Sequence, residues 1–250
     1  MEETTLMKIS RFYQDTDLHI DEVLELSDEN HRHAIQVLRL KANDPLIIFN
    51  GTGGEYLAHL ISVEKRKSCI IIDSFDPVNR ESSLYTTIFL AMIKPDKMDF
   101  AIQKMVELGV TEIQPMYTKR SVIKIKANRL EKKILHWQGI IIAACEQAGR
   151  TSIPIIHEPK TIDNCIKQRG NKNCFIMLPG DYKTMAEYQN MIKEGSGVSL
   201  LIGPEGGFTA DEECMILSNK ITPVSFGKRI LRAETAAISG LTACQLYWGE

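Results

Sequence analysis

The alternation of apolar, β-branched runs with amphipathic segments after residue 84 limits the fold of this chain more than any other feature of its sequence. The run LYTTIFLAMI at 84–93 indicates a buried strand, and VTEIQPMY at 110–117 indicates the next one. The segment between them places its apolar residues on one stripe of a helix, namely Met98, Ala101, Ile102, Met105 and Val106. A strand–helix–strand unit of this kind predicts a parallel pair of strands.

The same alternation continues through the rest of the chain. Further strands are predicted at 153–157, 173–178, 198–203 and 222–227. Helices are predicted near 126–148, 160–168, 183–193, 210–218 and 233–247. The pattern therefore predicts an α/β domain with a largely parallel sheet whose two faces are both covered.

The first 75 or so residues have a different pattern, which indicates a small β-rich domain. Three short strands are predicted at 46–49, 56–63 and 68–75, after a weakly helical stretch at 28–40. The polar segment 76–83 contains Pro77 and is typical of a linker. We therefore expect two domains, 1–77 and 78–250.

The overall composition favours a cytoplasmic globular protein. Hydrophobic residues make up 44% of the chain and charged residues 25%, with no apolar run long enough for a membrane span. The acidic N-terminal segment lacks the long apolar region of a secretory signal. The cysteines show no CxxC pairing, which favours buried thiols in a reducing compartment: Cys69, Cys145, Cys165, Cys174, Cys214 and Cys244. His31 and His33 would lie on different faces of a helix, so no metal site is expected.

Charge is distributed unevenly along the chain. The net charge of −2 argues against a uniformly basic nucleic-acid binder. Residues 1–78 carry 8 basic and 14 acidic side chains, or −6, which leaves 22 and 18, or +4, for residues 79–250. The window 119–133 holds seven basic residues and one acidic residue. It suits contacts with phosphate groups, although a solvated basic face explains it equally well.

Three predicted loops leave strand ends with an unusual composition: 178–181, 202–208 and 225–235. Ligands of open α/β sheets bind at the carboxyl ends of strands. The loop IGPEGGF at 202–208 holds three glycines, whose backbone can approach a ligand closely. It is no P-loop, because no Lys-Ser/Thr follows its last glycine. Taken alone, it is also compatible with a simple turn.

The loop 225–235 combines apolar residues with charged ones. Ile230 and Leu231 are flanked by charged and polar side chains, namely Lys228, Arg229, Arg232, Glu234 and Thr235. Such a loop is able to enclose a flat aromatic group and to place charges around it. Alternatively, Glu234 and Thr235 only begin the following helix, where a negative charge is favourable.

Several of these segments together resemble one family. The sequence GPEGG at 203–207, followed by GKRILRAETA at 227–236, is similar to the C-terminal signature of the RsmE family of SPOUT-class RNA methyltransferases. The stretches 94–110, 143–150 and 32–56 also match, so the resemblance covers nearly the whole chain. It implies a SPOUT-type parallel sheet with a C-terminal deep trefoil knot, preceded by a small PUA-like β-barrel domain. It also implies a homodimer.

The resemblance implies S-adenosylmethionine as the cofactor, bound by the three strand-end loops. The implied cofactor-binding residues are Leu178, Pro179, Gly180, Ile202, Gly203, Pro204, Glu205, Gly206, Gly207, Phe226, Gly227, Ile230, Leu231 and Arg232. Phe226 stands where leucine is common in the family, which should alter the packing near the adenine.

The reaction implied is methylation of N3 of a specific uridine in 16S ribosomal RNA of the small ribosomal subunit. Uridine N3 must lose its proton before it attacks a methyl group. We expect Arg232 to stabilise the anionic base, because a nearby cation lowers the pKa of N3. Glu234 or Glu205 is expected to accept the proton.

Contacts with the RNA are expected from both domains. The candidates are Arg11, Arg32, Arg39, Lys94, Arg120, Lys124, Gln147 and Arg150. Two other functions stay open from the sequence. The chain is either a related methyltransferase with another target, such as a transfer RNA or a ribose 2′-hydroxyl, or a non-catalytic RNA-binding protein.

Overall fold

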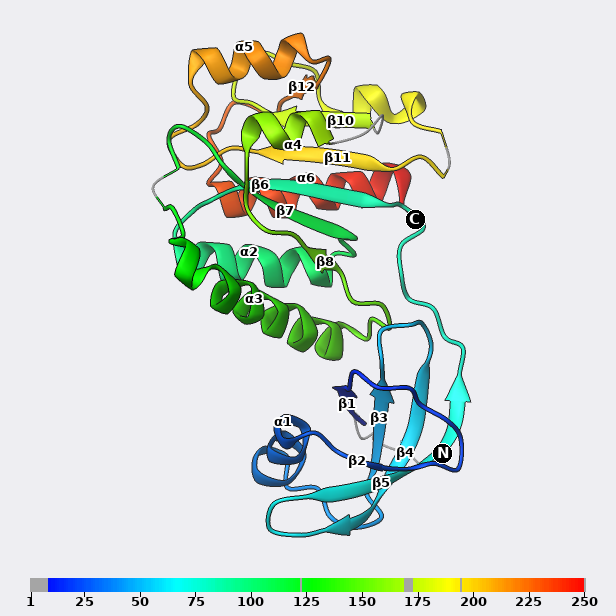
Figure 1. Ribbon diagram of the computed structural model, residues 1–250. Coiled ribbons are helices and arrows are strands. Elements are labelled where there is room, and N and C mark those ends of the chain that lie inside the picture. The colour runs from blue at the N-terminus through cyan, green and yellow to red at the C-terminus, as the bar shows by residue number, and fades with distance from the viewer. Residues whose placement is uncertain (1–8, 122, 169–172, 194, 250) are drawn as a thin grey trace. The chain divides into compact units, whose positions relative to one another are not determined.

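A computed structural model describes residues 9–121, 123–168, 173–193 and 195–249 (Figure 1). The chain forms two compact units, which we treat separately. The first unit is the chain up to Glu81 together with Cys145–Ile153, and the second is Ser82–Ala144 together with the chain from Pro154 onward. Most of the acidic N-terminal segment, and Val122 of the basic window, lie outside the described residues. The expected domains 1–77 and 78–250 stay a prediction.

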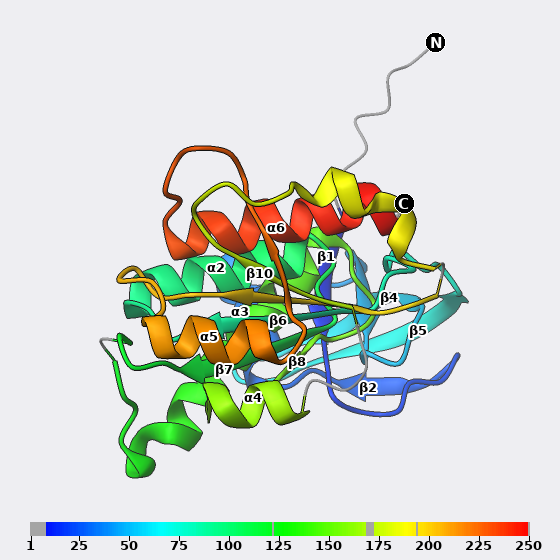
Figure 2. The same ribbon diagram turned by 90° about the horizontal axis from the view of Figure 1, so that it is seen from above.

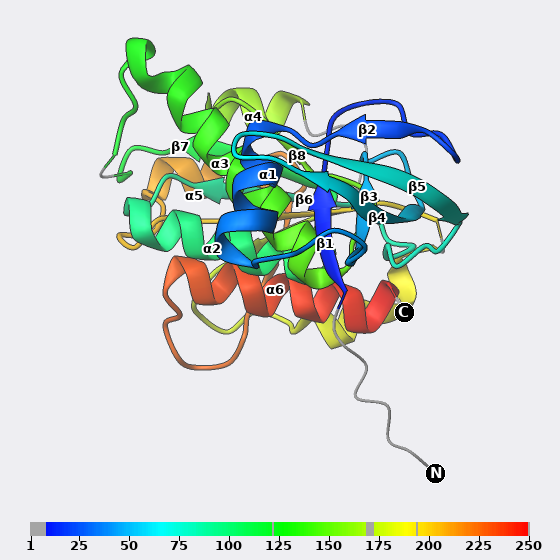
Figure 3. The same ribbon diagram turned by 90° about the horizontal axis from the view of Figure 1, so that it is seen from below.

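The first unit is built on a five-stranded sheet (Figure 3). Its strands are β1 (Ser10–Tyr13), β2 (Val23–Glu25), β3 (Pro45–Phe49), β4 (Glu55–Val63) and β5 (Ser68–Asp76), in the order β1-β3-β4-β5-β2. The pair β1–β3 is parallel, and the pairs β3–β4, β4–β5 and β5–β2 are antiparallel. The predicted strands at 46–49, 56–63 and 68–75 are confirmed.

The two edge strands of this sheet are bridged by one side chain. The amide of Gln14 donates to the carbonyl oxygen of Glu25 (3.0 Å), and its oxygen accepts from the backbone N–H of Ser27 (2.9 Å). The helical insert is a short helix, α1 (Asp28–His31), followed by a π-helical turn, η1 (Arg32–Val37). Ala34 packs with Phe12, Leu46 and Leu60 in the apolar core of this unit.

Ion pairs fasten the segment Cys145–Ile153 within the first unit. Arg11 contacts the carboxylate of Glu55 and donates to the carbonyl oxygen of Arg150 (2.9 Å). Arg80 donates to the same Glu55 carboxylate (3.1 Å). Arg150 donates through Nε to Glu81 (2.9 Å) and is only 6% exposed. These charges are removed from water in pairs, so loss of an arginine would leave its carboxylate as an uncompensated charge and destabilise the fold.

The second unit is built on a parallel sheet (Figure 2). Its strands are β6 (Thr86–Ala91), β7 (Glu112–Tyr117), β8 (Ile155–Ile156), β9 (Lys160–Thr161), β10 (Asn173–Met177), β11 (Val198–Ile202) and β12 (Thr222–Val224). The order is β12-β10-β11-β6-β7-β8, and β9 also pairs with β7. Every pairing is parallel, as the sequence pattern predicts.

Helices cover both faces of this sheet. They are α2 (Pro95–Glu107), α3 (Ala127–Ala148), α4 (Ile162–Gln168), α5 (Ala210–Ser218) and α6 (Ala233–Trp248), with a 3-10 helix, η2 (Met185–Met191), between β10 and β11. Figure 2 shows α2 and α6 on one face and α4 and α5 on the other. Asp99 of α2 accepts from His136 (2.7 Å) and Trp137 (3.2 Å) of α3, which fixes α3 to α2.

The packing of α6 on the sheet depends on a glycine. A Cβ at Gly240 would overlap the side chain of Leu200 in β11 and would lie 2.8 Å from Sδ of Met177 in β10. The helix therefore approaches the strands closely at this point. Among the described residues, no helix is both long enough and apolar enough to cross a membrane.

Candidate functional site

The carboxyl ends of β10, β11 and β12 bring their three following loops to one edge of the second unit. A cavity of about 330 Å³ opens there, within the usual size range of ligand sites. Its lining includes Leu178 and Pro179 after β10, Ile230 and Leu231 after β12, and the whole stretch Ile202–Gly207. The loops that the sequence singled out are thus neighbours in space.

The glycine-rich loop has a conformation that its residues make possible. Gly207 has φ +68°, which L side chains rarely adopt, and its N–H donates to the carbonyl oxygen of Pro204 (2.9 Å). A Cβ at Gly203 would lie 2.8 Å from the ring of Phe208. Phe208 is buried against the core and lines the cavity. Glycine at 203 therefore allows the Phe208 ring to anchor the loop.

Arg120 and Glu212 hold this loop in place. Arg120 follows β7 and donates to the carbonyl oxygens of Gly206 (2.8 Å) and Phe208 (3.1 Å). Glu212 is buried in the first turn of α5, where it accepts from the N–H of Thr209 (2.9 Å) and from the N–H of Lys119 (2.7 Å). The turn after β7 and the start of α5 are therefore joined in one wall of the cavity.

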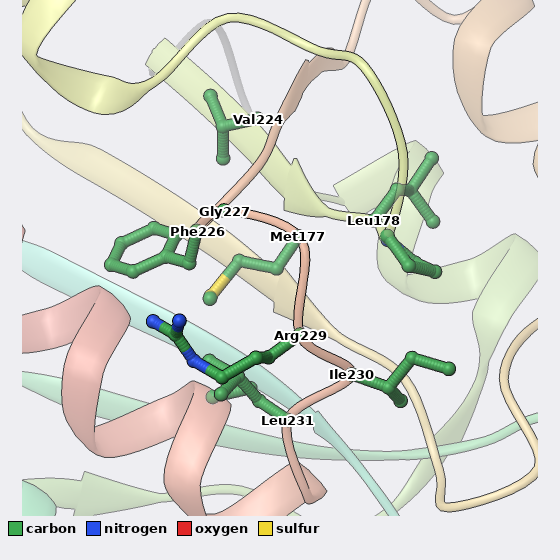
Figure 4. A pocket seen from close by; sticks show the side chains of 10 residues that line it. Met177, Leu178, Val224, Phe226, Gly227, Arg229, Ile230 and Leu231 are labelled. Carbon is green, nitrogen blue, oxygen red and sulfur yellow. The ribbon is translucent and has the colours of Figure 1, made fainter.

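The loop after β12 also lines a smaller cavity of about 70 Å³. This cavity shares Leu178, Pro179, Ile230 and Leu231 with the larger one, and Phe226 and Gly227 line it as well. Figure 4 shows the side chains of Phe226, Met177 and Arg229 on one side of the loop and that of Ile230 on the other. Ile230 is 84% exposed.

The first turn of α6 carries the remaining charged candidates. Arg232 is exposed at the N-cap position, and neither it nor Gly180 belongs to the lining of these two cavities. The side chain of Glu234 is only 8% exposed, and Nζ of Lys97 in α2 lies 3.8 Å from its carboxylate. Glu234 therefore lies in the first turn of α6, as the second interpretation of this loop predicted, and it is paired with Lys97. Glu205 is exposed and lines the larger cavity.

The residues predicted to contact RNA fall into two groups. Arg32, Arg39, Lys94, Lys124 and Gln147 are exposed. Arg11 and Arg150 are tied to Glu55 and Glu81, and Arg120 holds the glycine-rich loop. A phosphate contact by Arg11 or Arg150 would have to break a buried ion pair. All of these RNA contacts stay predictions.

Some lining residues were not predicted from the sequence. Met177, Phe208, Glu213, Ala233 and Ala236 line the larger cavity, and Arg229 lines the smaller one. Most of them directly follow or precede a predicted residue, so widening each loop by one or two positions would have found them. Glu213 carries no such signal. Arg120 was predicted only as an RNA contact, and contacts between distant segments bring it to the cavity.

Family models match most of the chain. A model described as an RNA methyltransferase domain matches residues 80–245, and one described as an RNA methyltransferase PUA domain matches residues 26–73. The ribosomal RNA small subunit methyltransferase E of Buchnera aphidicola subsp. Acyrthosiphon pisum is 35% identical, over 97% of this chain and 95% of the relative. The protein of the same name from Rickettsia conorii is 34% identical, over 96% of each chain.

Two solved structures are similar to this chain over nearly its full length. Lpg2936 from Legionella pneumophila, solved in complex with the bound cofactor SAM, has a TM-score of 0.93 and 36% identity, over 97% of this chain and 99% of the other. A ribosomal RNA small subunit methyltransferase E from Neisseria gonorrhoeae, bound to S-adenosyl methionine, has a TM-score of 0.88 and 33% identity, over 96% and 98%.

Proposed function

Because this chain belongs to the RNA methyltransferase family represented by ribosomal RNA small subunit methyltransferase E, we propose that it methylates 16S ribosomal RNA of the small subunit at N3 of one uridine. S-adenosylmethionine is the proposed methyl donor, since two similar structures were solved with it bound. The observation that carries the proposal is the meeting of three separate strand-end loops around one cavity.

The residues of the cavity suit such a cofactor. Leu178, Pro179, Ile202, Ile230 and Leu231 offer apolar surface for a flat adenine. Space is open beside Gly207, where a Cβ would meet no atom within 4 Å. When bound there, the cofactor supplies an electrophilic methyl group on a sulfonium. The cofactor-binding residues predicted from the sequence are kept in this role. Gly180 and Arg232 do not line the cavity, but each follows a residue that does, so their own contribution to cofactor affinity is expected to be small.

The chain's own contribution is to favour the deprotonated uracil and to hold it in place. Arg232 is exposed at the start of α6, and its guanidinium is proposed to donate to a carbonyl oxygen of the base. This contact would lower the pKa of N3 by stabilising the anion. Positioning of the two reactants supplies much of the remaining acceleration.

Glu205 is the better placed of the two candidate proton acceptors. It is exposed and lines the cavity, whereas Glu234 is buried and faces Lys97. We therefore assign the proton transfer to Glu205. The pair of Glu234 with Lys97 is assigned to fixing the first turn of α6, from which Arg232 projects.

The finer features of the fold belong to the same proposal. A SPOUT-class assignment with a deep trefoil knot in the β10–α6 region accords with the strand order, in which β12 returns to pair beside β10. A homodimer, which the family resemblance implies, and a cytoplasmic location, where ribosomes are found, are part of this proposal too.

The decisive experiment compares ribosomal RNA from a strain with and without the gene by mass spectrometry of nucleosides. We expect N3-methyluridine to disappear from 16S ribosomal RNA on deletion and to return when purified protein and S-adenosylmethionine are added to the small subunits. Unchanged N3-methyluridine in the deletion strain would reject 16S ribosomal RNA as the substrate. Loss of a methyl group from a ribose or from a transfer RNA would instead identify the chain as a related methyltransferase with that target.

A further inference from the structure

A second cavity lies beside the proposed cofactor site, and nothing in the proposed reaction uses it. It has a volume of about 320 Å³, comparable to that of the first. Its lining comes from the end of β7, the start of α4 and the first turns of α5, all in the second unit. We propose that this cavity binds a nucleotide of the RNA, next to the methylated one, whose base carries an exocyclic amino group. This inference rests on the proposed function.

The two cavities share a wall. Lys119 lines the second cavity, while the next residue, Arg120, lines the first. Likewise Asp211 and Glu212 line the second and Glu213 lines the first. Because consecutive residues line the two cavities, a nucleotide chain that enters one reaches the other within a short distance.

The inner surface of the second cavity suits a nucleobase. Ile162 is buried, and Met215 packs against the core, so both present apolar surface. Tyr117 ends β7, and its hydroxyl accepts from the N–H of Ile125 (3.3 Å), which fixes the ring in the wall. Aromatic and apolar surfaces of this kind hold unpaired bases by stacking.

The rim of the cavity carries both signs of charge. Lys119 and Asp211 pair with one another (3.0 Å), and Glu212 is occupied by backbone N–H groups. Lys124 and Asp163 are exposed, and the described part of the chain gives neither of them an ion-pair partner. A phosphate would satisfy the lysine, and an amino group would satisfy the carboxylate. A nucleotide of cytosine, adenine or guanine supplies both groups, whereas uracil has no amino group and offers only its ring N3–H as a donor.

The test measures the binding of two oligonucleotides that share the target uridine and differ in the bases beside it. Dissociation constants of the full-length protein, with S-adenosylmethionine present, are determined for two 12-mers with one central uridine, flanked by cytidine in one and by uridine in the other. We expect the wild type to bind the cytidine-flanked 12-mer at least about five-fold more tightly, and we expect Asp163→Ala to lose this preference. Asp163→Asn, which keeps the shape of the side chain, should be intermediate.

A second variant examines the phosphate contact. Lys124→Gln should weaken both oligonucleotides equally and lower the salt dependence of binding by about one unit of slope. The matched control is Lys220→Gln, an exposed lysine that follows the far end of α5 and should leave both constants unchanged. Affinity for S-adenosylmethionine should stay within about two-fold in every variant.

An equal preference in the wild type and in Asp163→Ala, of whatever size, would overturn the inference. The binding measurement does not depend on methyl transfer. A protein that binds as expected but transfers no methyl group would reject the proposed function and keep the nucleotide site.

Discussion

The arginines of the two units are used in opposite ways. In the first unit, Arg150 is only 6% exposed and is held by Glu81. In the second, Arg232 projects from the start of α6 and is exposed. Both residues stand in segments that the sequence singled out, AACEQAGR and GKRILRAETA. The comparison teaches that burial decides whether such a charge holds the fold together or is free to meet a ligand.

The largest effect is expected at Arg232. Arg232→Ala should lower kcat about 10²- to 10³-fold, because it removes a cation aimed at the developing negative charge. Affinity for S-adenosylmethionine and the free energy of unfolding should hardly change. Lys228→Ala is the matched control, since Lys228 is an exposed cation on the same loop that lines neither cavity. Near-normal kcat in Arg232→Ala would remove this residue from the mechanism.

Arg150→Met should instead lower the free energy of unfolding. It leaves Glu81, whose side chain is 19% exposed, without its cation, which should cost about 3 kcal/mol of unfolding free energy. The tryptophans, Trp137 and Trp248, both belong to the second unit, so amide hydrogen exchange in β4 is the suitable probe. Arg32→Met, at an exposed position of the same unit, should change stability by less than about 0.5 kcal/mol. If the β4 amides of Arg150→Met exchanged as slowly as those of the wild type, Arg150 would not hold the first unit together.

The pair of Lys97 and Glu234 lies between these two cases. Lys97→Met should lower kcat about ten-fold with little change in KM, because it loosens the turn that carries Arg232. Lys97→Arg should restore much of the rate, since it keeps the charge beside Glu234. A change in KM alone would instead make Lys97 an RNA contact.

The smallest effect is expected from the partly exposed cluster around Asp99. Burial raises the pKa of Asp99, but hydrogen bonds from His136 and Lys133 outweigh it and lower the pKa below its ordinary value. A lowered carboxylate pKa contributes stability above the unfolded pKa, and this contribution is lost as the pH falls through the folded one. Partial exposure should limit it to less than about 1 kcal/mol. Acid unfolding of Asp99→Asn should therefore differ from wild type only slightly, and a large shift would contradict the distinction between buried and exposed pairs.

Much of the fold follows from the sequence because apolar periodicity is a local signal. The strands β3 to β8 and β10 to β12 lie where the pattern predicts them, as do the helices α2 to α6. The strands β1 and β2 were not predicted, because each has four residues or fewer and little apolar alternation. The π-helical turn at Arg32–Val37 was expected only as weakly helical sequence.

The position of the site could be predicted from the sequence, but its long-range contacts could not. Parallel strands place their carboxyl ends at one edge, so the three loops were expected to meet. No pattern in the sequence shows that Glu55 would bury Arg11 or that Arg120 would bind the carbonyl oxygen of Gly206. Those contacts join residues that lie far apart in the chain, and only the assembled fold creates them.

The pairing of β6 with β11 has a consequence for how the molecule reaches its native state. Thr86 pairs with Val198, so the centre of the sheet forms only when distant parts of the chain meet. Such non-local pairing makes folding slow. The cavity after β11 does not exist in a half-formed sheet, and a small molecule that binds it therefore stabilises the finished fold over every earlier intermediate.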